Sequence, residues 1–146
     1  MARDAPGARA AVYGAAMTTP ASKTILIVDD EPSVREVLVG FFEHHYGPRG
    51  YSVETAGDGV AALAAVRRRR PALVLLDIDM PGMNGVEALR GVRAIDAGIP
   101  VIMVTGNTSA RVAGEVIKDG AFSYLPKPVR FQYLTHLAAT VLGPSG

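Results

Sequence analysis

Five short runs of apolar residues recur along the chain, and each is followed closely by an acid, a glycine or a proline. Four of the runs are nearly continuous, which is typical of strands that are buried on both faces. The second run alternates and contains β-branched residues, which suits a short strand. These patterns predict strands at Lys23–Val28, Tyr51–Thr55, Ala72–Asp77, Ile99–Val104 and Ala121–Leu125.

Between these runs, apolar residues recur at spacings of three and four, which is the pattern of a helix with one buried face. The helices are predicted to begin at Pro32, Asp58, Asn84, one of residues 107–109, and Pro128. Their buried faces are predicted to contain Val34, Val37, Leu38, Phe41 and Phe42; Val60, Leu63, Ala64 and Val66; Val86, Leu89, Val92 and Ile95; Val112, Val116 and Ile117; and Leu134, Leu137, Ala138 and Val141.

Polar residues and glycines mark the expected helix ends. Ser33 and Glu36 match a capping box, in which a hydroxyl and a carboxylate satisfy free amides of the first turn. Asp58 and Asn84 are suited to cap the second and third helices. Gly120 is expected to end the fourth helix in a left-handed conformation.

The alternation of five strands with five helices predicts an α/β fold, a parallel five-stranded sheet with helices on both faces. Parallel strands need a crossover between them, and helices usually provide it. Residues 1–22 are rich in alanine, glycine and proline, and we expect them to form a disordered tail before one domain at 23–146. Neither an internal repeat nor a second domain is expected.

Composition excludes several kinds of site. The chain has 15 basic and 14 acidic residues, and its net charge of +1 gives no reason to expect nucleic acid or an anionic membrane as a partner. It contains no cysteine, which excludes disulfides, iron–sulfur clusters and thiolate zinc sites. No apolar run approaches the roughly 20 residues of a membrane span. These features suit a cytoplasmic protein.

Five polar residues follow the predicted strands at their carboxyl ends: Asp29, Asp30, Asp77, Thr105 and Lys127. In a parallel sheet these ends lie along one edge, where ligands bind. Taken singly, most have an ordinary explanation, such as a helix cap or a solvated loop lysine. Asp77 has none, because a carboxylate at the end of a buried strand is costly unless it is paired or used.

The chemistry of this group favours phosphoryl transfer. Three clustered carboxylates repel one another unless a cation is present. Oxygen ligands without histidine or cysteine favour Mg²⁺. A lysine and a threonine beside the ion suit a phosphoryl group, and a carboxylate can accept one as an aspartyl phosphate. The residues therefore predict a Mg²⁺-dependent phosphorylation site on an aspartate.

From Lys23 to about Leu142 the chain resembles the receiver domain of bacterial two-component response regulators, including single-domain regulators of the chemotaxis type. The resemblance rests on Asp29-Asp30, on LLDIDMPGMNG around Asp77, on Thr105-Gly106, and on the motif from Tyr124 to Pro128. It implies a flavodoxin-like sheet with the strand order 2-1-3-4-5.

The resemblance also implies a metal site and a phosphoacceptor. Asp77 would accept the phosphoryl group and contact Mg²⁺. Asp30 would bind the ion directly and Asp29 through water. Asp79 would contribute its backbone carbonyl, so that its side chain need not touch the ion.

Further residues would couple phosphorylation to a change of shape. Lys127 would pair with the phosphoryl oxygens, and its bond to Pro128 would be cis. The hydroxyl of Thr105 would move towards the phosphate, and Tyr124 would rotate inward as the aromatic switch. The face made by the fourth helix, fifth strand and fifth helix would then change its affinity for a partner.

The resemblance implies partners as well. A sensor histidine kinase or a phosphotransfer protein would donate the phosphoryl group, and a downstream protein, not identified by the sequence, would read it. The domain would be no enzyme beyond its own phosphorylation and slow autodephosphorylation, whose rate depends on neighbours such as Asp79 and Asn107. We expect neither DNA binding within this chain nor membrane binding.

Two segments depart from the family pattern. The stretch His44–Gly50 is longer than usual, and it is expected to lie far from the strand ends. Its His44 and His45 are not expected to bind a metal, because adjacent helical positions point apart. The last helix begins with Val129, Arg130 and Phe131 where the family often has an acid, which would alter the signalling face.

Two other functions are compatible with parts of the pattern. Asp77-Ile78-Asp79 resembles the nucleophile motif of haloacid-dehalogenase-type phosphatases, but there the motif follows the first strand, and here it follows the third. A degenerate receiver that serves only as a binding scaffold is the second alternative. The presence of Asp29, Asp30, Asp77, Thr105 and Lys127 argues against it.

Overall fold

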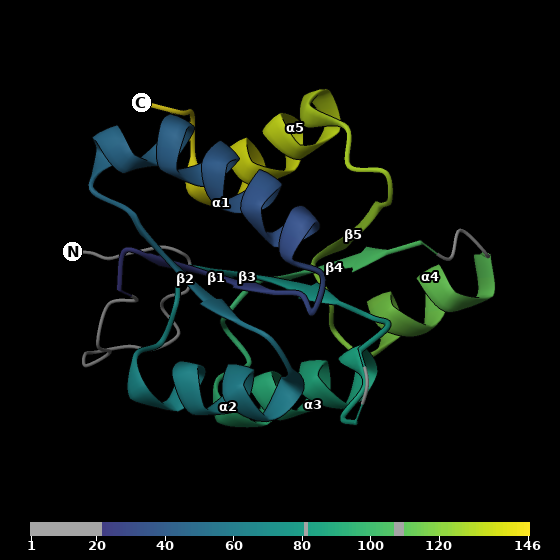
Figure 1. The fold of residues 1–146 in the computed structure, drawn as a ribbon. Coiled ribbons are helices and arrows are strands. Elements are labelled where there is room, and N and C mark those ends of the chain that lie inside the picture. Colours follow the sequence, from purple (N-terminus) through teal and green to yellow (C-terminus); the bar gives the residue numbers. More distant parts are fainter. Residues whose placement is uncertain (1–21, 81, 107–109) are drawn as a thin grey trace.

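The structure is a computed structural model, and it describes residues 22–80, 82–106 and 110–146. Its centre is a parallel sheet of five strands in the order β2-β1-β3-β4-β5 (Figure 1). The strands are β1 (Thr24–Val28), β2 (Ser52–Ala56), β3 (Leu73–Asp77), β4 (Val101–Thr105) and β5 (Ser123–Pro126). Each predicted strand is present within two residues of its expected bounds, and the predicted fold class and strand order are confirmed.

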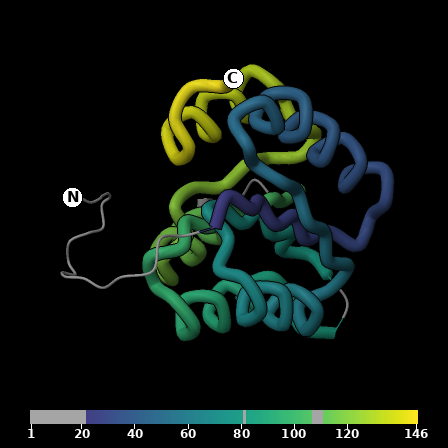
Figure 2. Tube along the Cα trace, turned by 90° about the vertical axis from the view of Figure 1, so that its left-hand side faces the viewer, coloured from purple at the N-terminus to yellow at the C-terminus, as the bar shows by residue number. Residues whose placement is uncertain are grey.

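Helices cover both faces of this sheet. They are α1 (Pro32–Tyr46), α2 (Gly59–Arg68), α3 (Gly85–Ile95), α4 (Ala110–Lys118) and α5 (Phe131–Leu142), with a short 3₁₀ helix η1 (Gly47–Arg49) after α1. In Figure 1, α1 and α5 lie on one face, and α2, α3 and α4 lie on the other. The view of Figure 2, turned by a quarter, shows the same three layers.

The central strands supply side chains to two cores because successive residues of a strand point to opposite faces. In β1, Ile25 and Ile27 pack in the core under α1 and α5. Leu26 and Val28 pack in the core under α2 and α3. All four are at most 1% exposed, which explains why residues 25–28 are all apolar.

The topology brings the polar strand ends together. From β1 the chain passes first to β2 on one side and then to β3 on the other, so the connections diverge between β1 and β3. The pairs Val28–Leu76, Asp77–Val104 and Thr105–Pro126 hold β1, β3, β4 and β5 in register. Open α/β sheets bind ligands at such a point, outside the carboxyl ends of the two strands between which the connections diverge.

Two predicted helix caps are confirmed. The Asp58 carboxylate accepts a hydrogen bond from the Ala61 amide at 2.8 Å, and Asn84 forms a capping box with Glu87. Gly120 has a positive φ of 103° after α4, as predicted. The caps expected among residues 107–109, and residues 1–21 of the tail predicted at 1–22, lie outside the described residues. The prediction is wrong for Ser22, whose amide and hydroxyl both donate to the Arg70 carbonyl.

The predicted start of the first helix at Pro32 is confirmed, but its predicted capping box and the predicted start of the last helix are wrong. The N-cap of α1 is Glu31, so Pro32 is the first helical residue and Ser33 already lies inside the first turn, where its hydroxyl cannot cap the helix. Helix α5 begins at Phe131 and not at Pro128. The Lys127 amide still donates to the Thr105 carbonyl at 2.8 Å, so the chain follows the sheet edge there and turns into the helix only later.

The predicted buried faces are partly wrong. Val37, Val60 and Ile117 are 46%, 67% and 46% exposed, and Ala64 is exposed as well. In α2 the cap at Asp58 sets the rotation of the helix, and small residues face the core instead: Gly59, Ala62 and Ala65, beside Leu63 and Val66. Among the described residues, no helix is long and apolar enough to cross a bilayer.

Candidate phosphoryl and metal site

Asp77 ends β3 inside the protein, with a side chain that is 1% exposed. Its Oδ1 accepts a hydrogen bond from the Asp79 amide at 3.1 Å. Its Oδ2 has no hydrogen-bond partner among the described residues. A buried carboxylate oxygen without a partner is costly, so this atom is prepared for a ligand that the protein itself does not supply.

The loop after Asp77 is held closely against the start of α3. The Ile78 amide donates to the Val104 carbonyl at 3.0 Å, and the Gly85 amide donates to the Ile78 carbonyl at 2.9 Å. A Cβ atom on Gly85 would overlap the Asp77 carbonyl oxygen and the Ile78 Cα. Glycine at this position therefore lets α3 start directly beside the strand end.

Asp29 directly follows β1, in the same environment, and is also 1% exposed. Its Oδ1 accepts from the Glu31 amide at 2.9 Å, while its Oδ2 has no hydrogen-bond partner among the described residues. The neighbouring Asp30 is exposed. Asp29, Asp30 and Asp77 each place one carboxylate oxygen within 4.8 Å of the others.

Lys127 reaches this cluster from the loop after β5. Its Nζ lies 3.5 Å from Asp77 Oδ2 and 3.6 Å from Asp29 Oδ2. Its shortest contact, 2.9 Å, is with Glu31 Oε1. The ammonium group thus sits among three carboxylates contributed by two loops.

The electrostatics follow from burial and crowding. The pKa of Asp77 is raised to about 6, mainly by burial and also by the charge of Asp29, against the lowering effects of the Asp79 amide and Lys127. Burial lowers the pKa of Lys127, but the hydrogen bond to Glu31 and the charges of Asp29 and Asp77 outweigh it. The pKa of Lys127 is therefore raised, and the amine stays protonated at neutral pH.

The donor set fits a hard divalent cation such as Mg²⁺. It consists of carboxylate oxygens alone, and two of them, Asp29 Oδ2 and Asp77 Oδ2, are buried and lack hydrogen-bond donors among the described residues. Mg²⁺ binds through a few carboxylates and keeps several waters. The exposed Asp30 leaves one side of the cluster accessible to them.

The other predicted site residues lie around this centre at different distances. Thr105 ends β4, is 1% exposed, and accepts the Lys127 amide with its carbonyl. Asp79 turns its amide towards Asp77, and its side chain is exposed. Tyr124 lies on β5 and is half-buried against the core under α2 and α3.

Two further predictions concern the loops beside the site. Asn107 lies outside the described residues, and the predicted cis bond between Lys127 and Pro128 is present.

Sequence reasoning missed two residues that shape the site. Glu31 binds Lys127, and the Arg35 guanidinium donates to the Asp29 carbonyl at 2.6 Å. The acidic run Asp29-Asp30-Glu31 was a signal for the first residue. The spacing of Arg35 from Glu31, one helical turn, places it at the same helix end, but only its side-chain conformation shows which carbonyl it reaches.

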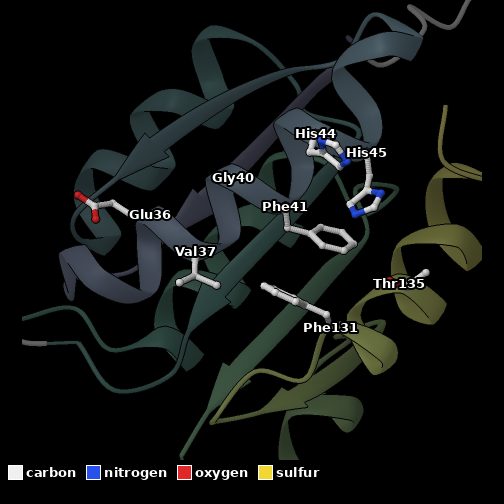
Figure 3. Close-up of a pocket in the computed structure, with 8 residues that line it drawn as sticks. All are labelled: Glu36, Val37, Gly40, Phe41, His44, His45, Phe131 and Thr135. Atoms are coloured by element: carbon white, nitrogen blue, oxygen red, sulfur yellow. The ribbon is translucent and has the colours of Figure 1, made fainter.

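A second concavity, of about 370 Å³, lies between α1 and α5 (Figure 3). Phe41 and Phe131 stack across it with ring centroids 5.8 Å apart. The expectation that His44 and His45 point apart is wrong, since their rings meet edge to face at 4.8 Å, which neighbouring rotamers on the last turn permit. Within the described ranges no third acid or histidine joins them as a potential metal ligand.

Comparisons with known proteins agree with this geometry. The profile of the response regulator receiver domain family matches residues 25–139. The DNA-binding response regulator MtrA of Mycolicibacterium smegmatis is 42% identical over 106 residues, which cover 73% of this chain and 44% of that protein. The chain therefore spans less than half the length of this curated relative.

Solved structures show the same fold. The chemotaxis protein CheY4 of Vibrio cholerae is 34% identical with a TM-score of 0.71, over 82% of this chain and 98% of that one. CheY in the CheX–CheY–BeF₃–Mg²⁺ complex of Borrelia burgdorferi is 26% identical with a TM-score of 0.73, over 81% and 87%.

Proposed function

The chain belongs to the response regulator receiver domain family, and on this premise we propose that it is a phosphorylation-dependent signalling switch. Asp77 accepts a phosphoryl group from a histidine kinase or a phosphotransfer protein. The phosphorylated form then binds a downstream partner that the unphosphorylated form binds less well. The DNA-binding activity in the name of MtrA belongs to that longer protein, and it is not part of this proposal.

The observation that carries the proposal is the environment of Asp77 Oδ2. This oxygen is buried, has no hydrogen-bond partner among the described residues, and lies 3.5 Å from a lysine ammonium. A structural carboxylate would be fully hydrogen-bonded. A nucleophile needs a free oxygen, a nearby positive charge for the incoming group, and access from solvent, which the exposed Asp30 side provides.

The proposed reaction balances without an added oxidant or reductant. Asp77 Oδ2 attacks the phosphorus of a phosphohistidine, and an O–P bond forms. The P–N bond breaks, and its electron pair returns to the imidazole, which takes up a proton. Hydrolysis later reverses the loading, because water attacks the same phosphorus and the Asp77 carboxylate leaves. The protein contributes mainly orientation and charge stabilisation.

Asp29, Asp30 and Asp77, with the Asp79 carbonyl, are the groups proposed to hold Mg²⁺. A bound divalent cation would offset the negative charge of the phosphoryl oxygens. The Borrelia burgdorferi CheY named above was solved with BeF₃ and Mg²⁺, and its similarity to this chain supports the assignment. Lys127 is proposed to pair with the phosphoryl oxygens from the other side.

The signal is proposed to leave the site through Thr105 and Tyr124. Thr105 ends β4, the strand that pairs with β3, and its hydroxyl is proposed to donate to a phosphoryl oxygen on Asp77. A shift of Thr105 would open space beside β5, where Tyr124 is half-buried. The surface formed by α4, β5 and α5 would change with it, which is a population shift between two arrangements.

Acetyl phosphate and Mg²⁺ provide a direct test. The protein is expected to gain one phosphoryl group, detected by intact mass, and the gain is expected to vanish in Asp77→Asn and when EDTA removes the metal. Phosphorylation of Asp77→Asn to the wild-type level would refute the assignment of the acceptor. Rapid multiple turnover of a phosphate ester would favour the phosphatase alternative, since a receiver releases phosphate slowly. Absence of any phosphorylation would favour the binding scaffold.

A further inference from the structure

The ammonium of Lys127 makes its best contact outside the buried pair. Nζ lies 2.9 Å from Glu31 Oε1, within hydrogen-bond distance, but 3.5 and 3.6 Å from the oxygens of Asp77 and Asp29. Glu31 is largely exposed, whereas Asp29 and Asp77 are each 1% exposed. An exposed acid thus holds the cation that a phosphoryl group on Asp77 would need.

The backbone of Glu31 is fixed by the site itself. Its amide donates to Asp29 Oδ1 at 2.9 Å, and its carbonyl accepts the Arg35 amide at 3.0 Å as the first bond of α1. Glu31 is the N-cap of α1, yet its side chain makes no capping hydrogen bond. The carboxylate is therefore committed to Lys127 and not to the helix end.

We propose that Glu31 is a positioning residue that competes with the phosphoryl group for Lys127. The inference rests on the function proposed above. In the unphosphorylated domain, Glu31 keeps the ammonium at the mouth of the site, away from full contact with Asp29 and Asp77. After phosphorylation, the phosphoryl oxygens on Asp77 draw the ammonium inward, because a phosphoryl group carries more negative charge and more acceptor oxygens than the Glu31 carboxylate. Glu31 thereby lowers the affinity of the site for a phosphoryl group.

This competition predicts opposite effects on a cation and on an anion. In Glu31→Gln, Lys127 is released towards Asp29 Oδ2 and Asp77 Oδ2. Mg²⁺ alone must then compete with the ammonium for these oxygens, so its affinity falls about two- to fivefold. At saturating Mg²⁺, the Lys127 ammonium is free to bind beryllofluoride because position 31 no longer competes for it. The affinity of the protein for beryllofluoride therefore rises about two- to fivefold.

A shorter acid separates the contact from the charge. Glu31→Asp keeps the negative charge near the site but shortens the side chain by one methylene, which withdraws the carboxylate from Nζ. If the contact matters, Glu31→Asp behaves as Glu31→Gln does. If only the charge matters, Glu31→Asp behaves as the wild type does, and the proposal is overturned.

The test measures two affinities by NMR, from the chemical shifts of backbone amides near the site. The first titration uses MgCl₂ alone, and the second uses beryllofluoride at saturating MgCl₂. Glu43→Gln, an exposed position on the last turn of α1, controls for the change in net charge, and it is expected to match the wild type in both titrations. The role of Glu31 is overturned if the affinities for Mg²⁺ and for beryllofluoride change in the same direction. It is also overturned if neither Glu31 variant changes either affinity. A wild-type protein that binds no beryllofluoride overturns the proposed function itself, so the two failures are distinguishable.

Discussion

The two edges of the sheet satisfy their polar groups to very different degrees. At the carboxyl edge, one oxygen each of Asp29 and Asp77 is buried without a hydrogen-bond donor among the described residues. At the amino edge, the Tyr46 hydroxyl donates to the Gly143 carbonyl at 2.9 Å, and Arg49 donates to the carbonyls of Leu142 and Pro144 at 2.8 and 2.7 Å. Oxygens that have an ion pair but no hydrogen bond thus gather where a ligand is proposed to bind, and hydrogen-bonded groups gather where the structure is held together.

The long segment His44–Gly50 explains the amino edge. It ends α1, forms η1, and brings Arg49 to the end of α5, whose last turn contains no basic residue. A cation there opposes the negative end of the helix dipole. Figure 1 shows the end of the chain beside the end of α1, and the Gly146 amide donates to the His45 carbonyl at 2.9 Å. The segment that departs from the family pattern therefore fastens α5 to α1.

The largest effect is expected from Gly85→Ala at the carboxyl edge. The new methyl group would overlap the Asp77 carbonyl and the Ile78 Cα, and backbone atoms cannot move aside as a flexible side chain can. We expect a loss of about 3 kcal/mol in the free energy of unfolding, measured by urea denaturation.

Gly40→Ala is the matched control for that change. Gly40 lies within α1, and a Cβ there meets nothing within 4 Å. Alanine is expected to stabilise the helix by about 0.5–1 kcal/mol. Equal unfolding free energies for the two variants would contradict the close packing at the strand end.

The fold could be predicted from sequence because its strands are continuous apolar runs that end in turn residues. β1 and β3 are buried on both faces, so no polar residue interrupts the pattern. The strand ends then lie along one edge by topology, and Asp29, Asp77 and Lys127 could be placed together before any distance was known.

Helix rotation was harder to predict because small residues form part of the core. A Cβ on Gly59 would lie 2.8 Å from Met83 Sδ, and one on Gly91 would lie 2.8 Å from the Leu63 methyl groups. Glycine at these points lets the Met83 and Leu63 side chains pack closely against the helix backbones, although an apolar pattern assigns glycine no weight. Val60 was therefore predicted to be buried, and it faces solvent.

The roles of Glu31 and Arg35 could not be predicted for a different reason. Both are long side chains near the surface, with many conformations available to them. Spacing places them at the start of α1, but it does not determine that Glu31 reaches Lys127 or that Arg35 reaches the Asp29 carbonyl. Such contacts depend on the relative positions of two loops, which local patterns do not encode.

A medium effect, with a distinctive pH dependence, is expected from Asp77→Asn. The pKa of Asp77 is raised from 3.8 to about 6, so the folded protein holds this proton more tightly than the unfolded chain does. Asp77 therefore reduces stability as the pH rises from 3.8 to about 6, and the full penalty applies above that range. Removing the charge is expected to raise the free energy of unfolding by about 2 kcal/mol at pH 7.5 without Mg²⁺.

Most of the gain should disappear near pH 3.5, where Asp77 is protonated in the folded state and largely protonated in the unfolded state. Urea denaturation at the two pH values measures the difference. Asp58→Asn is the control, because Asn also caps a helix, and the expected change is below about 0.5 kcal/mol. A gain for Asp77→Asn of the same size at both pH values would show that burial of its charge is not the cause.

The smallest effect is expected at the amino edge, from Tyr46→Phe. Tyr46 is 2% exposed, and the variant keeps the ring but leaves the Gly143 carbonyl without the hydroxyl donor. The loss should be about 1 kcal/mol in the free energy of unfolding. Tyr133→Phe is the matched control, because Tyr133 is 39% exposed and its hydroxyl lies 3.5 Å from the Tyr124 carbonyl, at the limit of a hydrogen bond.

The rate of phosphorylation by acetyl phosphate should be the same in Tyr46→Phe as in the wild type, because the hydrogen bonds at the amino edge hold α5 and do not reach Asp77. A slower rate at unchanged stability would mean that the two edges are coupled.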